Sequence, residues 1–181
     1  MRRPFSDNPT RCPIRGIALV VEIHIATDQL SIAASRNLGA GRAIEQGADI
    51  LIFLDLDCVP TDTLLSAYAD AARLFPNAIL SGAVGYLPEG TDAFSPARAE
   101  KAYFHKFHPR LRPRQTKPAH PTLFWSLSFA MTTWMWQRAG GFCEDYLGYG
   151  AEETDFAQIS SHSGIPWRHR SAYGHARQRA G

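Results

Sequence analysis

Two carboxylates spaced two residues apart, Asp55 and Asp57, follow the apolar segment ILIFL at residues 50–54. If that segment is a strand continuing through residue 57, both side chains leave the same face. They would then lie at the carboxyl end of the strand, where open α/β sheets bind ligands. Two neighbouring anions repel, and a hard divalent ion shared with substrate phosphates would relieve this. The structural alternative is that Asp55 or Asp57 caps a helix after Pro60.

A second acidic group, Glu152, Glu153 and Asp155, follows the glycine-punctuated segment 148–150. Acids in the first turn of a helix are favoured by the helix dipole, so capping is one explanation. Glycines also let a loop approach a ligand closely, and a carboxylate at a loop-to-helix junction can act as a general base. With the first pair, this group predicts transfer from a metal-bound diphosphate: the metal stabilises the departing diphosphate, and the base takes the proton of an attacking hydroxyl.

These carboxylates must be positioned by alternating strands and helices, the pattern typical of an α/β sheet. Residues 1–13 are expected to form a loose arm, and residues 14–181 a single domain with a basic, proline-rich loop at about 105–121. Residues 124–131 alternate in polarity and predict a half-buried strand, and 169–179 form a basic, His-containing tail. The other predicted strands are 16–25, 50–57 and 78–86; the predicted helices are 31–46, 61–75 (capped by Thr61 or Asp62), 132–139 and 152–163.

Composition excludes several classes of protein. A formal net charge of +2 gives no general attraction to nucleic acid, so no specific nucleic-acid partner is expected. The three cysteines are widely spaced, which favours a reducing compartment over a disulfide framework or zinc site. We expect no signal peptide, because polar residues rather than an apolar segment follow Met1, and no apolar run reaches the ~18 residues of a membrane span. The expected location is cytoplasmic, with peripheral membrane contact left open.

Four stretches together resemble the GT-A fold glycosyltransferases, in particular the large inverting, family-2-like group with a galactosyltransferase-like C-terminal half. They are AASRNLGAGRA (33–43), ILIFLDLDCVP (50–60), FWSLSFAMTTWMWQRAGGFCEDYLGYGAEETDFA (124–157) and the His-bearing tail. The resemblance implies an α/β, Rossmann-like mixed sheet flanked by helices. It also implies metal-dependent, inverting transfer of a sugar from a nucleotide-diphosphate sugar, with a UDP-sugar favoured, to a glycan, lipid-linked or small-molecule acceptor.

The resemblance assigns roles on the donor side. Asp55 and Asp57 match the DxD motif, with Asp57 the more direct ligand of Mn²⁺ or Mg²⁺. Arg36 and Asn37 match a motif beside the diphosphate or uridine end of the donor. His175 resembles the histidine that completes the metal shell; the alternative for this tail residue is simple solvent exposure.

The resemblance also assigns roles on the acceptor side. Glu153 occupies the position of the catalytic base, where the family usually has aspartate, and Glu152 would bind an acceptor hydroxyl. Trp125 and Tyr149 could stack on sugar faces, although core packing is favoured for Trp125. The loop that encloses the acceptor and donor sugar would contain Gly140, Gly141, Gly148, Tyr149, Gly150 and Asp155.

The same family begins with a strand, helix, strand unit that binds the nucleotide base. The residues before Arg36 hold one plausible strand, followed by ATDQL at 26–30, and Asp28 lies too near Arg36 to replace the aspartate of that unit. The sequence therefore predicts a GT-A sheet without its first strand-helix-strand unit, as in a chain truncated at its amino end. Nucleotide binding would then be weakened.

Two other functions fit parts of the sequence. The haloacid-dehalogenase-like phosphatases also place D-x-D-x-[VT] after an apolar strand, with Asp55 as nucleophile and Asp57 as acid/base. A non-catalytic binding module is suggested by the Lys and Arg residues of 98–117, which are interleaved with aromatic side chains and could contact phosphate backbones or anionic lipid. A solvated acceptor-side loop is the alternative for that segment.

Overall fold

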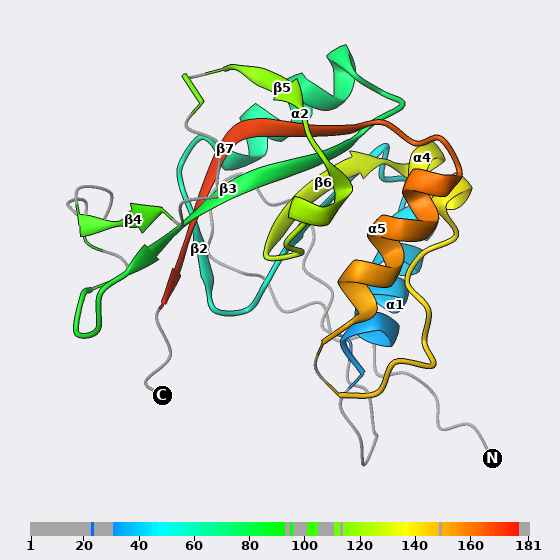
Figure 1. Cartoon of the computed structure of the whole chain (residues 1–181), viewed down its shortest axis with the longest axis horizontal. Helices are drawn as coiled ribbons and strands as arrows, with labels where there is room; N and C mark the ends of the chain where they lie inside the picture. Colours follow the sequence, from blue (N-terminus) through cyan, green and yellow to red (C-terminus); the bar gives the residue numbers. More distant parts are fainter. Residues whose placement is uncertain are drawn as a thin grey trace.

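The computed structural model describes residues 23, 31–92, 95, 101–104, 111–112, 114–148 and 150–177, with side chains as far as Ser171. The strand predicted at 16–25, apart from residue 23, therefore lies outside the described residues. Tyr149 and residues 105–110 and 113 of the basic loop also fall outside them, and the prediction about the opening unit concerns residues that are not described. Within the described part, a mixed sheet is flanked by helices, which confirms the predicted fold class (Figure 1).

One sheet contains all the described strands. β3 and β7 run parallel, and every other described pair is antiparallel. β4 (Tyr103–Phe104) pairs with β3, and β5 (Thr116–Pro118) pairs with β7. The main strand order is β1 (Ile50–Leu54), β6 (Ser128–Thr132), β3 (Ile79–Leu87), β7 (Trp167–Arg177) and β2 (Cys58–Pro60).

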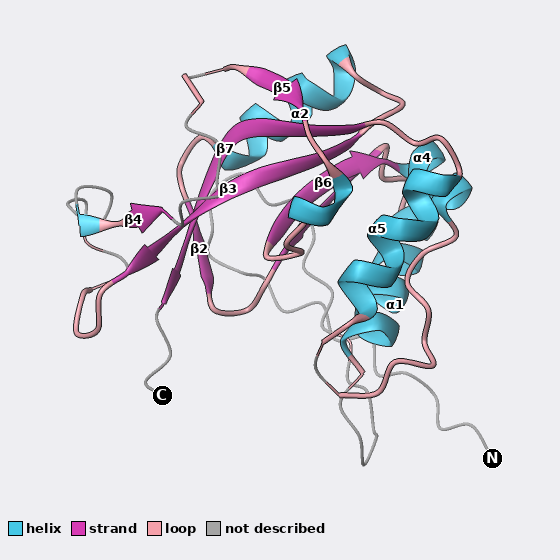
Figure 2. Cartoon of the chain, viewed as in Figure 1, coloured by secondary structure: helices cyan, strands magenta, loops and turns pink. Residues whose placement is uncertain are grey.

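Helices cover both faces of this sheet. α1 (Ile32–Glu45), α4 (Thr133–Ala139) and α5 (Glu152–His162) lie together on one side, while α2 (Leu64–Leu74) lies apart from them (Figure 2). Two adjacent residues of β6 face opposite sides of the sheet. Phe129 packs in the core under α1, α4 and α5, whereas Ala130 packs against α2. A short 3₁₀ helix, η1 (Pro121–Leu123), precedes β6. None of the described helices has the length and apolar character needed to cross a membrane.

Aromatic side chains connect α5, whose first turn carries the second acidic group, to the sheet. The rings of Phe53 and Phe129 stack with centroids 4.3 Å apart. Phe142, which follows α4, stacks on Phe156 of α5 at 4.4 Å. The ring centroids of Phe129 and Phe156 lie 6.3 Å apart. Aromatic pairs contribute beyond their buried area, so this cluster fixes α5 against β1 and β6.

The acidic pair lies in a turn rather than on a strand, so the prediction of a strand through residue 57 is wrong. β1 ends at Leu54, and the backbone N–H of Cys58 donates to the carbonyl of Asp55 at 2.9 Å. The alternation of side chains along a strand therefore does not set the directions of Asp55 and Asp57. The predicted caps are wrong too: the N-cap of α2 is Thr63, without a side-chain cap bond, and not Thr61, Asp62 or either acid of the turn.

Three other segments differ from the prediction because of their place in the sheet. β6 is buried on both faces, because α1, α4 and α5 cover one face and α2 covers the other, and it begins at Ser128 rather than at residue 124. The segment predicted as a basic tail instead forms part of strand β7 as far as it is described, and β7 pairs with β3, β5 and β2. The end of the predicted loop 105–121 includes strand β5. The helices over 31–46, 132–139 and 152–163 and the strand over 78–86 are confirmed within a few residues.

We expect stability to fall at mildly acidic pH because of His169. The residue is 8% exposed, its Nε2 has no hydrogen-bond partner, and burial lowers its pKa. The unfolded chain takes up a proton near pH 6.5, whereas the folded chain takes it up only at lower pH. The free energy of unfolding should therefore decrease as the pH falls from about 7.5 to about 5.5, when measured by urea denaturation.

The His169→Gln variant should show a smaller decrease, because glutamine does not titrate. His162→Gln is the matched control, since His162 is exposed and its ring Nδ1 contacts the Gln158 carbonyl at the surface. Equal pH dependence in the wild-type protein and His169→Gln would contradict this account.

Candidate functional site

The acidic turn between β1 and β2 concentrates negative charge. Asp55 is half-buried, with its side chain 31% exposed, and Asp57 is also half-buried. Burial, followed by the charges of Asp57 and Asp55, raises the pKa of the buried Cys58 thiol to about 12. The backbone N–H of Asp55 donates to the Leu127 carbonyl at 3.0 Å, which joins the turn to the segment before β6. The turn is therefore fixed to the sheet, and its two carboxylates disfavour ionisation of the Cys58 thiol.

Arg36 of α1 joins this turn to the second acidic group. Its Nη2 donates to Oδ1 of Asp55 at 2.8 Å, and its Nη1 donates to Oε1 of Glu152 at 3.3 Å. The Arg36 side chain is only 10% exposed, and its guanidinium carbon lies 5.2 Å from the centre of the Phe142 ring. The structure thus brings together Arg36 and Asp55, which the resemblance assigned to the donor side, and Glu152, which it assigned to the acceptor side. The donor-binding role of Arg36 stays a prediction.

Glu152 begins α5 and is buried, with its side chain 5% exposed. The residue before it, Ala151, has a φ of 69°, and no side chain caps this helix. Oε1 of Glu152 contacts Arg36, while Oε2 is buried without a hydrogen-bond partner. A buried carboxylate oxygen without a donor is costly. The predicted contact of Glu152 with an acceptor hydroxyl is untested.

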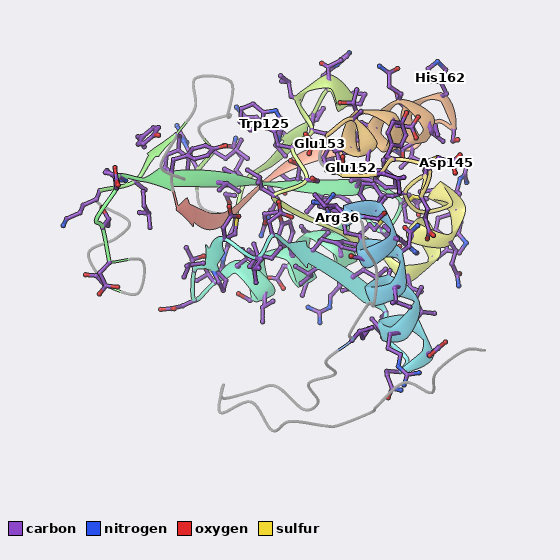
Figure 3. The ribbon with its side chains drawn as sticks, turned by 90° about the horizontal axis from the view of Figure 1, so that it is seen from below. Arg36, Trp125, Asp145, Glu152, Glu153 and His162 are labelled. Atoms are coloured by element: carbon purple, nitrogen blue, oxygen red, sulfur yellow. The ribbon has the colours of Figure 1, made fainter. Side chains whose placement is uncertain are left out.

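Glu153, the predicted base, is held by Ser126. Its Oε2 accepts hydrogen bonds from the Ser126 backbone N–H at 3.0 Å and from the Ser126 hydroxyl at 2.6 Å. Trp125 is adjacent in sequence and half-buried. In Figure 3, Arg36, Glu152, Glu153 and Trp125 follow one another across the molecule. The sequence did not identify Ser126 as a site residue. Ser126 is polar but buried, and its burial is visible only in the fold.

Asn37 fastens the glycine-rich loop to α1. Its amide nitrogen donates to the Phe142 carbonyl at 2.8 Å and to Glu144 at 2.9 Å, while its oxygen accepts from the Phe142 N–H at 2.9 Å. Gly148 forms a bridge with Ser31, the residue whose hydroxyl caps α1. The side chain of Asn37 therefore organises the protein itself, and its predicted contact with the donor is untested.

The remaining predicted residues lie around this network. Gly148 and Gly150 adopt positive φ values of 83° and 103°, so the loop uses glycine where other residues would be strained. The charge of Asp155 raises the pKa of Tyr146 in the same loop, and Oδ2 of Asp155 is buried without a partner. The backbone of His175 pairs with Val59, two residues after Asp57, but its side chain lies outside the described part.

A divalent cation fits the chemistry of the turn. No group of three or more His, Cys, Asp and Glu side chains suited to a metal occurs among the described residues. Asp55 is paired with Arg36, and the role of Asp57 as a ligand of an ion stays a prediction. Mg²⁺ and Mn²⁺ commonly bind through one or two carboxylates and complete their shells with diphosphate oxygens. His175 as a further ligand also stays a prediction, because only its backbone, paired with Val59, is described.

The two other functions are not tested by this geometry. The phosphatase alternative would use Asp55 as its nucleophile, and it stays a prediction. The binding-module alternative depends on residues 98–117, of which 98–100, 105–110 and 113 lie outside the described residues.

We expect Gly141→Ala to destabilise the protein more than Gly140→Ala. Both glycines have positive φ, 73° and 82°. A Cβ at residue 141 would lie 2.8 Å from Oδ1 of Asn37, whereas at residue 140 it would meet nothing within 4 Å. The backbone strain of about 1–2 kcal/mol is common to both, and the clash should add roughly 1–3 kcal/mol at residue 141 alone. Urea denaturation measures the difference, and equal losses would contradict the role given to Asn37.

Comparison with known proteins supports the fold. No protein-family model matches the chain, and no curated protein matches it. The structure is similar to the crystal structure of GalNAc-T7 with UDP, GalNAc and Mn²⁺, with a TM-score of 0.61 and 12% sequence identity. The match covers 82% of this chain and 31% of that chain, so this chain spans about a third of its length. GalNAc-T7 is a GT-A fold glycosyltransferase, and the described chain therefore has a mixed α/β sheet that resembles the GT-A fold.

Proposed function

We propose that the chain acts in the transfer of a sugar from a nucleotide-diphosphate sugar, with a UDP-sugar favoured, to an acceptor hydroxyl with inversion. The observation that carries the proposal is the position of Arg36 between Asp55 and Glu152. It brings the acidic turn next to the helix that carries Glu153, so a cation-bound donor and a base would meet in one place. The fold similarity supports the same class of reaction.

In this proposal the chain belongs with inverting, family-2-like enzymes whose C-terminal half is galactosyltransferase-like. A bound Mn²⁺ or Mg²⁺ would neutralise the charge that develops on the departing diphosphate. Asp57 would hold that ion, with His175 as a further ligand. The acceptor is a glycan, a lipid-linked sugar or a small molecule with a free hydroxyl.

The base in this proposal is Glu153. The two hydrogen bonds from Ser126 hold one oxygen of its carboxylate and leave the other for a proton from the acceptor hydroxyl. The attacking oxygen would approach the sugar carbon opposite the diphosphate, and this direction of attack gives inversion. Trp125 is the residue proposed to present an apolar face to the sugar.

Binding of UDP should require Mn²⁺ and Asp57. In calorimetric titrations of the full chain, we expect Asp57→Asn to weaken Mn²⁺-dependent UDP binding by about tenfold or more, which equals ~1.4 kcal/mol. The physical reason is the loss of a charged ligand from a hard cation. Asp62→Asn is the matched control, because Asp62 is exposed a few residues along the chain. Binding that is independent of Mn²⁺, or unchanged in Asp57→Asn, would contradict the proposed metal site.

Turnover should depend on Glu153 without a matching effect on donor binding. We expect Glu153→Gln to lower kcat for release of UDP from UDP-sugars by about 10²–10⁴-fold, the usual contribution of a general base. Its amide can still accept the Ser126 hydrogen bonds, so the affinity for UDP and Mn²⁺ should be retained. Asp145→Asn, at an exposed position in the neighbouring loop, serves as control. Full turnover in Glu153→Gln would remove Glu153 from the mechanism.

A further inference from the structure

Arg170 of β7 is buried without a carboxylate partner. It is 3% exposed, and it donates hydrogen bonds to the carbonyls of Ala67 and Arg114 and to the Thr116 hydroxyl. These acceptors are all neutral, and no ion pair among the described residues includes Arg170. A buried charge is normally paired, because its removal from water is costly. The positive charge of Arg170 is therefore available to an anion.

The guanidinium of Arg170 also has donors that are not used. Its hydrogen bonds are made by Nε and Nη1. Its Nη2 makes no hydrogen bond with the described residues, and it is not among their buried side-chain atoms that lack a partner. Nη2 therefore reaches the surface, although most of the residue is covered. Because a guanidinium is planar and rigid, the anchored nitrogens fix the direction in which Nη2 donates.

Two further arginines lie beside Arg170. Arg168 precedes it by two residues on β7, so both side chains leave the same face of the sheet. The Arg168 side chain is half-buried, and its guanidinium carbon lies 4.0 Å from the centre of the Phe75 ring at the end of α2. Arg114, whose carbonyl Arg170 holds, is exposed. The carboxyl end of a helix supplies only about half a negative charge, which does not balance these arginines.

A tight turn before β5 holds Arg114 in place. The backbone N–H of Gln115 donates to the Arg112 carbonyl at 2.9 Å, and the N–H of Arg112 donates to Oε1 of Gln115 at 3.0 Å. Arg114 has a φ of 62°, a left-handed conformation that is unfavourable for a residue with a side chain. The hydrogen bond from Arg170 to its carbonyl helps to hold this conformation. Backbone strain of this kind is concentrated at binding sites.

We infer that Arg170, Arg168 and Arg114 form a binding site for a phosphate group. A phosphate monoester carries a charge of about −1.5 to −2 at pH 7, more than a carboxylate, and its three oxygens accept several N–H donors at once. Arg170 contacts α2, whereas α1 and α5, which carry the residues proposed for sugar transfer, lie together on the other side of the sheet (Figure 2). The site is therefore separate from the proposed function and does not depend on it.

Calorimetric titration of the full chain with inorganic phosphate tests this site. EDTA is present to exclude metal-dependent binding, and chloride keeps the ionic strength constant. We expect Arg168→Gln to weaken phosphate binding by about tenfold, because a charge-assisted hydrogen bond is lost. Arg170→Lys should weaken it at least as much, since lysine cannot hold the carbonyls and also direct a donor to the surface. Acetate should bind less tightly than phosphate by about tenfold or more, because it carries a single charge.

Arg138→Gln is the matched control, because Arg138 of α4 is also exposed beside an aromatic ring, that of Trp134. Circular dichroism checks folding, and Arg168→Gln decides the outcome if Arg170→Lys does not fold. The inference is overturned if the wild-type chain binds no phosphate, if Arg168→Gln binds it as tightly as the wild type, or if Arg138→Gln weakens binding equally.

Vesicles identify the source of the phosphate group. If a lipid headgroup is the ligand, the chain should bind vesicles of phosphatidylcholine with phosphatidic acid, inorganic phosphate should compete, and Arg168→Gln should reduce the binding. Binding of inorganic phosphate without binding to these vesicles would identify a soluble phosphate compound as the ligand of the same site.

Discussion

A buried ion pair shared by three elements is the constraint on which this structure depends. Arg36 cannot be buried without carboxylate partners, because an unpaired charge of this kind costs several kcal/mol. Its partners come from the turn after β1 and from the start of α5, so both must approach α1. The neighbouring Asn37 then links α1 to Phe142, and the stacking of Phe142 on Phe156 links that segment to α5.

The parts of the fold that follow from local patterns could be predicted from the sequence. α4 ends at Gly140, which adopts the left-handed conformation that glycine permits, and α5 begins at the acidic cluster that suits the positive end of a helix. The two acidic groups were recognised by residue type and spacing alone. That they share one arginine could not be predicted, because it depends on contacts between residues far apart in the sequence.

The wrong predictions also involve contacts between residues that lie far apart in the sequence. The turn after Leu54 is set partly by a distant contact, the bond from the Asp55 N–H to the Leu127 carbonyl, and partly by its own closing bond from Cys58 to Asp55. The basic character of residues 169–179 suggested a tail, but Arg170 is 3% exposed and donates to the carbonyls of Ala67 and Arg114 and to the Thr116 hydroxyl. Ser126 is recognisable only once Glu153 is seen beside it.

The position of β2 in the sheet has a consequence for how the chain folds during synthesis. In the described sheet, β2 pairs with β7 alone, although more than a hundred residues separate them along the chain. The acidic turn thus leaves the ribosome early, but its second strand acquires a partner only when β7 has been made. Pairing at such long range is slow because the loop must close first. The strand that follows the acidic turn is therefore expected to be one of the last parts of the described sheet to become ordered.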